Sequence, residues 1–269
     1  MAWRPPAYVR ELPGPAGAPA LVLLHGLTAS ADLNWFPSFD ALGREFRVVS
    51  YEHRGYGDCG DPGTLEDCAD DAVAVADALG IDRLVAVGYS MGGAIAQLVW
   101  RRHPHRVQGL VLCATGRSFR VTPRERAMAA TLGISAAASR LSPSVGRRFV
   151  GATLIRRFEG SPLRPWAEAE LRRHHPAAIL ECARSLARFS SAEWVGGVDV
   201  PTAVVVTTGD VLVPPDRQRA LAQAIPGATV HPVDGDHGAF LDSDRFPPVL
   251  LEACRAVAGR GLGGTDHDP

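Results

Sequence analysis

The pentapeptide Gly88-Tyr89-Ser90-Met91-Gly92 follows an apolar run at residues 84–87 and precedes a stretch with helical spacing of apolar residues. A strand that turns at once into a helix forces the residue at the bend into a strained backbone conformation. Side chains two positions before or after the bend would collide with the neighbouring strand and helix, which explains glycine at 88 and 92. The serine at the bend projects away from the sheet, beside the N-terminus of the new helix. This arrangement suits a nucleophile and poorly suits a structural serine.

Short apolar runs alternate with amphipathic helical patterns along most of the 269 residues. Alternation of strand and helix builds a parallel sheet that is covered by helices on both faces. The sequence therefore predicts an α/β protein with a doubly wound, mostly parallel β-sheet. The expected strands cover residues 20–24, 46–51, 84–88, 109–114, 202–208 and 229–233, and the clearest expected helices cover residues 65–79 and 246–257.

The alternation breaks between Arg117 and Val195, where prolines interrupt apolar residues at mixed helical spacings. This pattern predicts a helical cap at residues 117–195, inserted into a core made of residues 1–116 and 196–258. The glycine- and aspartate-containing tail at residues 259–269 is expected to be disordered. The inserted segment holds fourteen arginines, six glutamates and no aspartate, a net charge of +8 in a chain of net charge −1. Either these arginines lie on solvated helix faces, or the cap attracts anionic substrates, acidic carrier proteins or anionic lipid surfaces.

The overall composition excludes several classes of function. The net charge of −1 gives no whole-chain argument for nucleic-acid binding. All basic residues are arginine, which excludes a Schiff-base lysine and a P-loop lysine. Neither nucleotide-binding fingerprint occurs, and no metal-binding motif is found, so no cofactor and no metal are expected.

The cysteines and the N-terminus indicate a reducing, cytoplasmic setting. The five cysteines are widely spaced and no C-x-x-C occurs, so no disulfide framework is indicated. Residues 1–8 lack a basic and then apolar leader, and no apolar run approaches the roughly 18 residues that a membrane span needs. We therefore expect no transmembrane segment. The sequence does not indicate the oligomeric state.

A serine hydroxyl is a weak nucleophile and needs a base within hydrogen-bond reach. His237 is the candidate base, because it lies in a glycine- and aspartate-rich loop directly after the last expected strand, at the same sheet edge as Ser90. The alternative is an ordinary loop histidine. Surface or capping roles fit the histidines at 103, 105, 174 and 175 better, and His231 lies inside an expected strand.

The base needs an acidic group to orient it. Asp210 follows the strand expected at residues 202–208, at the carboxyl edge where sheet proteins place functional groups. Asp216 is a rival, but after two prolines it fits the first turn of a helix better. Asp236 adjoins His237 in sequence, and adjacent residues rarely align for this hydrogen bond. Asp210 is therefore the preferred orienting acid.

The developing oxyanion needs two hydrogen-bond donors. The backbone N–H of Met91 is one candidate, at the start of the helix that follows Ser90. The second is the backbone N–H of Leu27, in the loop after the first core strand, where His25-Gly26 lets the backbone pass close to the nucleophile. His25 then braces this loop and is not a second base.

Four motifs together resemble the α/β-hydrolase superfamily over residues 8–258. They are His25-Gly26, the stretch from Gly88 to Gly93, Gly209-Asp210 and Asp236-His237, in that family's chain order of serine, aspartate and histidine. The resemblance implies a doubly wound sheet with an inserted helical cap. Residues 51–57 resemble the family's Asp-x-Arg-Gly-x-Gly turn, with Glu52 where aspartate is common, a departure that concerns loop packing.

Serine at position 90 favours acyl transfer, since similar epoxide hydrolases and dehalogenases carry aspartate there and dienelactone hydrolases carry cysteine. We expect hydrolysis of a small-molecule carboxylic ester through an acyl-enzyme. Thioester hydrolysis on acyl-CoA or carrier-bound acyl groups is the alternative, and dehalogenase, C–C hydrolase or perhydrolase activity uses similar scaffolds. A non-catalytic ligand-binding member is the alternative of another class. Trp35 and Phe36 are candidates for the wall of the acyl pocket or for a hydrophobic anchor at a helix start.

Overall fold

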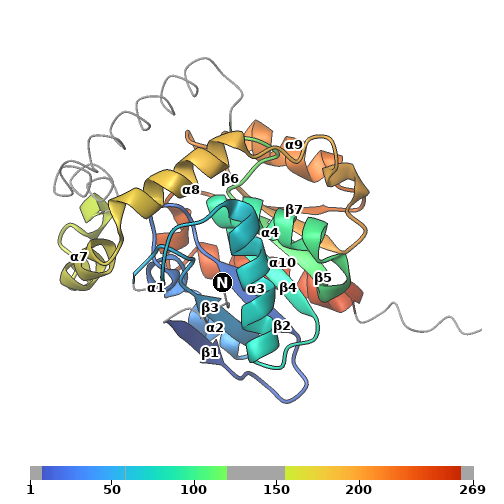
Figure 1. Ribbon diagram of the computed structural model, residues 1–269, viewed down its shortest axis with the longest axis horizontal. Helices are drawn as coiled ribbons and strands as arrows, with labels where there is room; N and C mark the ends of the chain where they lie inside the picture. Colours follow the sequence, from blue (N-terminus) through green and yellow to red (C-terminus); the bar gives the residue numbers. More distant parts are fainter. Residues whose placement is uncertain (1–7, 58, 120–154, 262–269) are drawn as a thin grey trace, which may run out of the picture.

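A seven-stranded sheet forms the centre of the protein (Figure 1). The computed structural model describes residues 8–57, 59–119 and 155–261. The strand order is β1-β3-β2-β4-β5-β6-β7, with β1 antiparallel to β3 and the other neighbouring pairs parallel. The strands are β1 (Val9–Leu12), β2 (Ala20–Leu24), β3 (Arg47–Tyr51), β4 (Leu84–Tyr89), β5 (Val107–Cys113), β6 (Thr202–Thr207) and β7 (Thr229–Val233).

All six strands expected from the sequence are present, with ends within two residues of the expected ones. The α/β class and the mostly parallel sheet are thereby confirmed. The additional strand is β1, a four-residue edge strand with two charged residues and a half-exposed surface. A short edge strand that is only partly buried lacks the continuous apolar run by which the inner strands are recognised.

Successive residues of each inner strand point into two separate hydrophobic layers. One layer packs α3 (Leu65–Ala78), α4 (Met91–Arg102) and α9 (Pro215–Ala224) against the sheet. The other layer packs α1 (Ala31–Trp35), α2 (Phe39–Gly43) and α10 (Phe246–Gly261) against the opposite face. The sheet is therefore doubly wound, as expected. Short 3₁₀ turns η1 (Pro104–Arg106), η3 (Val195–Gly197) and η4 (Ala239–Leu241) complete the core.

The described part of the inserted segment is helical. It contains η2 (Arg156–Phe158), α7 (Arg164–Arg172) and α8 (Pro176–Arg188), drawn in yellow in Figure 1. Helix α8 joins the layer that holds α3, and the N–H of Leu65 donates to the Ser185 hydroxyl at 3.0 Å. Helix α7 packs on the other layer through Ala167. A bridge between Ser118 and Ser190 joins the two ends of the segment.

The division into core, cap and tail stays a prediction. Residues 120–154 of the expected cap and residues 262–269 of the expected tail lie outside the described residues. Helix α10 runs to Gly261, three residues past the expected end of the core. Within the described ranges, every helix is too short or too polar to cross a bilayer.

Candidate active site

The backbone bend at Ser90 joins β4 directly to α4. Ser90 has φ 55° and ψ −111°, a strained conformation for a residue with a side chain. A methyl group built on Gly88 would lie 2.1 Å from the carbonyl oxygen of Gly92, and one built on Gly92 would lie 2.0 Å from that of Leu24. The expected steric reason for both glycines is confirmed.

Two hydrogen bonds fix the backbone of Ser90 at the bend. Its N–H donates to the carbonyl of Cys113 at 2.8 Å, and its own carbonyl accepts from the Thr115 hydroxyl at 2.8 Å. Cys113 is the last residue of the neighbouring strand β5, and Thr115 lies two residues after it. The Ser90 residue is 8% exposed, so its hydroxyl is held at a defined place with little contact to bulk water.

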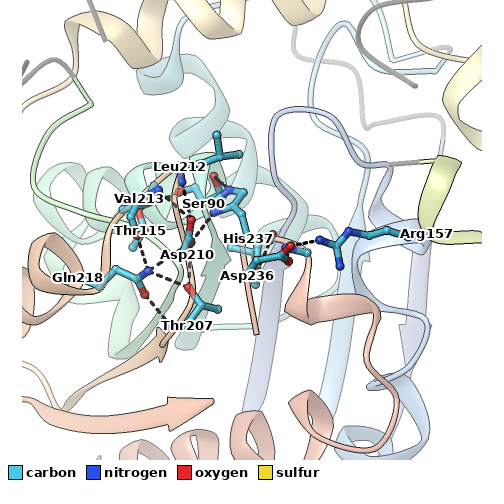
Figure 2. A network of polar contacts seen from close by, with 12 residues as sticks. Ser90, Thr115, Arg157, Thr207, Asp210, Leu212, Val213, Gln218, Asp236 and His237 are labelled. Atoms are coloured by element: carbon cyan, nitrogen blue, oxygen red, sulfur yellow. Dashed lines mark hydrogen bonds and ion pairs between the residues drawn. The ribbon is translucent and has the colours of Figure 1, made fainter. Parts of the chain in front are cut away.

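His237 bridges Ser90 and Asp210 (Figure 2). Its Nε2 atom lies 2.9 Å from Ser90 Oγ, and its Nδ1 atom lies 2.7 Å from Asp210 Oδ2. With Nδ1 protonated and donating to the carboxylate, Nε2 is the acceptor that faces the serine hydroxyl. The Tyr89 hydroxyl donates to the carbonyl of His237 at 3.1 Å and holds the loop after β7 against the bend. The structure thus brings the three predicted side chains together.

The carboxylate of Asp210 is fully buried but well supplied with donors. The N–H groups of Leu212 and Val213 donate to Oδ1 at 2.8 and 2.9 Å. Burial alone would raise the pKa of Asp210, but the hydrogen bond and charge of His237 and the further donors lower the pKa below its usual value. Asp210 is therefore ionised beside the imidazole at neutral pH.

The rival acids point elsewhere. Asp216 lies in the first turn of α9, as expected, and its side chain is fully exposed. Asp236 accepts from the N–H of Gly238 at 2.8 Å and forms an ion pair with Arg157 of the inserted segment (Figure 2). Among these carboxylates, Asp210 is the one that contacts the His237 ring.

The loop after β2 passes beside Ser90. A methyl group built on Gly26 would lie 3.7 Å from Ser90 Cβ. The Gly26 N–H donates to Asn34 Oδ1 at 2.9 Å, and the Tyr56 hydroxyl donates to the carbonyl of Leu27 at 2.7 Å. Leu27 is thus held near the nucleophile, and Met91 is the first residue of α4. Their roles as oxyanion donors stay a prediction.

Buried histidines support this loop from behind. His25 Nδ1 lies 2.9 Å from the carbonyl of Gly26, and its Nε2 accepts the backbone N–H of His53 at 3.1 Å. Burial lowers the pKa of His25 well below its usual value and lowers the pKa of His53 to about 3, so both rings are neutral. His25 therefore braces the loop, in line with the role expected for it.

The other histidines that the structure describes divide into buried and surface positions. His231 is buried in β7, as expected, and His103 ends α4 with Nε2 2.7 Å from Asp70. The expectation of a surface role for His174 was wrong: it is 3% exposed, its ring packs against Tyr56, and burial lowers its pKa to about 4. The inserted segment buries it against the core, which its local sequence does not reveal.

The two aromatic residues after the His25-Gly26 motif differ in environment. Trp35 is fully buried and its ring packs edge-on against Tyr89, inside the hydrophobic layer. Phe36 is half-buried and contacts Trp166 of α7, with ring centroids 5.1 Å apart. The burial of Trp35 fits an anchor, whereas Phe36 lies between core and inserted segment. A pocket role stays a prediction for both.

Several supporting residues were not anticipated from the sequence, namely Thr115, Tyr56, Thr207, Gln218 and Arg157. Thr115, Tyr56 and Arg157 contact segments that are far from them in the chain, at the sheet edge that carries the site. Of these five, only Gln218 could have been noticed from its local sequence, because it is a polar residue at the helical spacing of Leu221 and Ala222, on the buried face of α9.

Comparison with known proteins gives a consistent family assignment. Residues 19–244 match the family model described as the alpha/beta hydrolase fold. A protein of Caulobacter sp. (strain K31), provisionally named carbamate hydrolase RutD, is 30% identical over an alignment 268 residues long, gaps included, and the match covers 93% of each chain.

Solved structures share the fold at lower identity. The enol-lactonase from Burkholderia xenovorans LB400 superposes with a TM-score of 0.79 at 24% identity, covering 92% of this chain and 95% of that one. A thermophilic esterase from Thermogutta terrifontis gives a TM-score of 0.78 at 24% identity, covering 94% and 93%. At this identity the likeness is one of fold.

Proposed function

This chain belongs to the alpha/beta hydrolase fold family, and we propose that it is a serine hydrolase that cleaves carboxylic esters through an acyl-enzyme. The observation that carries the proposal is the continuous contact from Asp210 through His237 to Ser90, at 2.7 and 2.9 Å. A buried carboxylate, an oriented imidazole and a hydroxyl at a strained bend are the groups that nucleophilic acyl transfer requires.

The reaction uses each group in turn. His237 Nε2 removes the proton of Ser90 as Oγ attacks the ester carbonyl, and the ionised Asp210 stabilises the imidazolium that forms. The imidazolium then protonates the departing alkoxide, which leaves as the alcohol. In the second half, His237 takes a proton from water as the water attacks the acyl-enzyme, and returns it to Ser90 when the acid leaves.

The negative charge on the carbonyl oxygen needs donors that are already oriented. The N–H of Met91, at the start of α4, and the N–H of Leu27 supply them in this proposal. The Tyr56 and Asn34 contacts to the loop support it, because they fix the backbone on both sides of the Leu27 N–H. Loss of one such donor typically removes about 3 kcal/mol of transition-state stabilisation.

Carbamates are a second candidate substrate class. The Caulobacter relative provisionally named carbamate hydrolase covers nearly the whole chain at 30% identity. A carbamate carbonyl presents the same target to Ser90 as an ester does, with nitrogen in place of carbon on the acyl side. Thioesters are a third class, favoured by the net charge of +8 at residues 117–195.

A panel of p-nitrophenyl esters from short to long acyl chains, with matched carbamates, tests the proposal. Turnover should fall on the order of 10^3- to 10^6-fold in Ser90→Ala. A fluorophosphonate probe should label the wild type and spare the variant. Equal turnover in wild type and Ser90→Ala would exclude the mechanism. Absence of both turnover and labelling in the wild type would instead favour a ligand-binding member of the family.

The rate of acyl-CoA hydrolysis at low and high salt tests the thioester alternative separately from ester hydrolysis. If the positive inserted segment steers an anionic substrate, added salt should lower kcat/KM for acyl-CoA, because screening shortens the range of the attraction. The neutral p-nitrophenyl acetate serves as the control and should respond little. An acyl-CoA rate that is independent of salt would remove the reason for this alternative.

A further inference from the structure

Gln218 is a fully buried amide on the sheet-facing side of α9. A buried amide has to find partners for both its oxygen and its nitrogen, because unpaired polar groups inside a protein are unfavourable. Its partners among the described residues lie at or after the carboxyl end of β6 (Figure 2), and they include Asp210 itself, whose Oδ2 accepts from Gln218 Nε2 at 3.3 Å. Gln218 plays no part in the reaction steps described above.

The surroundings of Gln218 allow one orientation of its amide. Oε1 accepts the backbone N–H of Thr207 at 3.1 Å, and Nε2 donates to the carbonyl of Val213 at 2.7 Å. In the flipped orientation, oxygen would face the Val213 carbonyl and the NH₂ group would face the Thr207 N–H. Both contacts would then be repulsive, so the amide nitrogen points toward the Thr207 hydroxyl.

This orientation also fixes the proton of the Thr207 hydroxyl. Gln218 Nε2 lies 2.8 Å from Thr207 Oγ1 and can only donate there. The hydroxyl oxygen is therefore the acceptor in that contact, and its own proton is directed at Asp210 Oδ2, 2.9 Å away. The same carboxylate oxygen accepts the Nδ1 proton of His237.

We propose that Gln218 and Thr207 are positioning residues for the orienting acid: the amide sets the direction of the hydroxyl, and the hydroxyl holds the carboxylate oxygen that faces His237. The Leu212 and Val213 N–H groups hold the other oxygen, Oδ1. The carboxylate is thereby fixed at both oxygens. Hydrogen bonds thus connect Gln218, Thr207, Asp210, His237 and Ser90 in that order.

The hydroxyl also moderates how strongly Asp210 attracts the imidazole proton. A carboxylate oxygen that loses one donor becomes more basic and stabilises the imidazolium more strongly. His237 would then stay protonated to higher pH, and only the neutral ring can act as the base. Among the described residues, the other ionisable groups near the ring are Tyr89, whose ring lies 5.8 Å from it, and Asp236 with its partner Arg157. These groups stay unchanged in the variants below.

The test compares Thr207→Val with Thr207→Ser. Assuming the ester hydrolysis proposed above, Thr207→Val should lower kcat about 10-fold with little change in KM. In the plot of kcat against pH, the rise on the acidic side (the acid limb) should move to higher pH by about one unit. Thr207→Ser keeps the hydroxyl and should bring the limb back to its wild-type position. Gln218→Leu should shift the limb in the same direction, and the double variant should shift it less than the sum of both.

Thr202→Val is the matched control, since Thr202 is buried in the same strand and its hydroxyl donates to the carbonyl of Val200 at 3.0 Å, at the other end of β6. It should lower stability without moving the limb. A Thr207→Val profile that superimposes on that of the wild type would overturn the positioning role. The NMR titration of the His237 ring reads the same shift without substrate. If wild type lacks Ser90-dependent turnover, the proposed function fails while this titration still decides the role of Thr207.

Discussion

The α-carbon of Gly92, at the start of α4, lies against the carbonyl group of Leu24, at the end of β2. A methyl group built on Gly92 would come within 2.0 Å of the carbonyl oxygen, far inside any real contact of a β-carbon. The helix that begins after Ser90 and the strand that leads into the Leu27 loop are therefore in direct backbone contact. The spacing between the nucleophile and this loop depends on position 92 having no side chain.

Gly92→Ala should reduce activity far more than stability. The new methyl group requires a shift of α4 away from β2, and a misplacement of about 1 Å can lower the rate about 10²-fold. Overpacking of this kind typically lowers stability by about 1–3 kcal/mol. Gly259→Ala in α10, where an added methyl group meets no atom of another described element within 4 Å, is the control and should be neutral or slightly stabilising. Wild-type kcat in Gly92→Ala would contradict the argument.

Tyr56→Phe tests the hydrogen bond that holds the Leu27 carbonyl. The variant keeps the buried ring and removes the donor that lies 2.7 Å from this carbonyl. We expect kcat to fall about 3- to 10-fold, less than the loss of a whole oxyanion donor, with KM little changed. Tyr51→Phe is the matched control, because the Tyr51 hydroxyl donates to the backbone of Cys68 at 3.4 Å. Equal losses in both variants would show a general effect of removing buried hydroxyls.

The sheet and the bend at Ser90 could be read from the sequence because local patterns determine them. Inner parallel strands are buried on both faces, so each one is a continuous apolar run. The glycines at 88 and 92 report a steric requirement that any residue with a side chain violates. The positions of Asp210 and His237 follow from the same topology, since the carboxyl ends of parallel strands meet at one edge.

The support around these side chains could not be read in the same way. Tyr56 and Leu27 are 29 residues apart, and Arg157 and Asp236 are 79 residues apart, so neither contact has a local periodicity. Edge strand β1 has only four residues and a half-exposed pattern. His174 is buried by the packing of the inserted segment against Tyr56, a tertiary contact that the helical spacing of that segment does not determine.

Arg157 ties the inserted segment to the loop that carries His237. It pairs with Asp236, and its guanidinium covers Gly238, where an added methyl group would lie 2.6 Å from its Cζ. Both charged side chains are more than one third exposed, so we expect Arg157→Ala to lower stability by less than about 1 kcal/mol. The variant should still lower kcat several-fold, because the loop next to His237 loses its cover. Arg164→Ala, which removes an exposed pair with Glu168 in the same segment, should leave kcat unchanged.

Glu52 occupies a buried position where ionisation is unfavourable. It is 1% exposed, and its Oε1 accepts the N–H of Ala31 at 3.1 Å. Its Oε2 makes no hydrogen bond among the described residues, and the neutral ring of His25 lies 3.5 Å from it. Burial raises the pKa of Glu52 from the ordinary 4.5 to about 7. Below pH 4.5 the carboxyl is protonated in both the folded and the unfolded chain. Between these two values the unfolded chain releases the proton and the folded chain keeps it, so stability falls as the pH rises toward 7.

Glu52→Gln should therefore stabilise the protein more at about pH 8 than at about pH 5, in each case relative to wild type. Glutamine keeps the oxygen that accepts the Ala31 N–H and never ionises, so the stability difference between variant and wild type should grow by about 2 kcal/mol over this interval. Urea unfolding of both proteins at the two pH values measures it. Glu66→Gln, at an exposed glutamate in the first turn of α3, serves as the control. A difference for Glu52→Gln that is the same at both pH values would show that Glu52 is ionised in the folded protein throughout the interval, with a partner for Oε2 that compensates its burial.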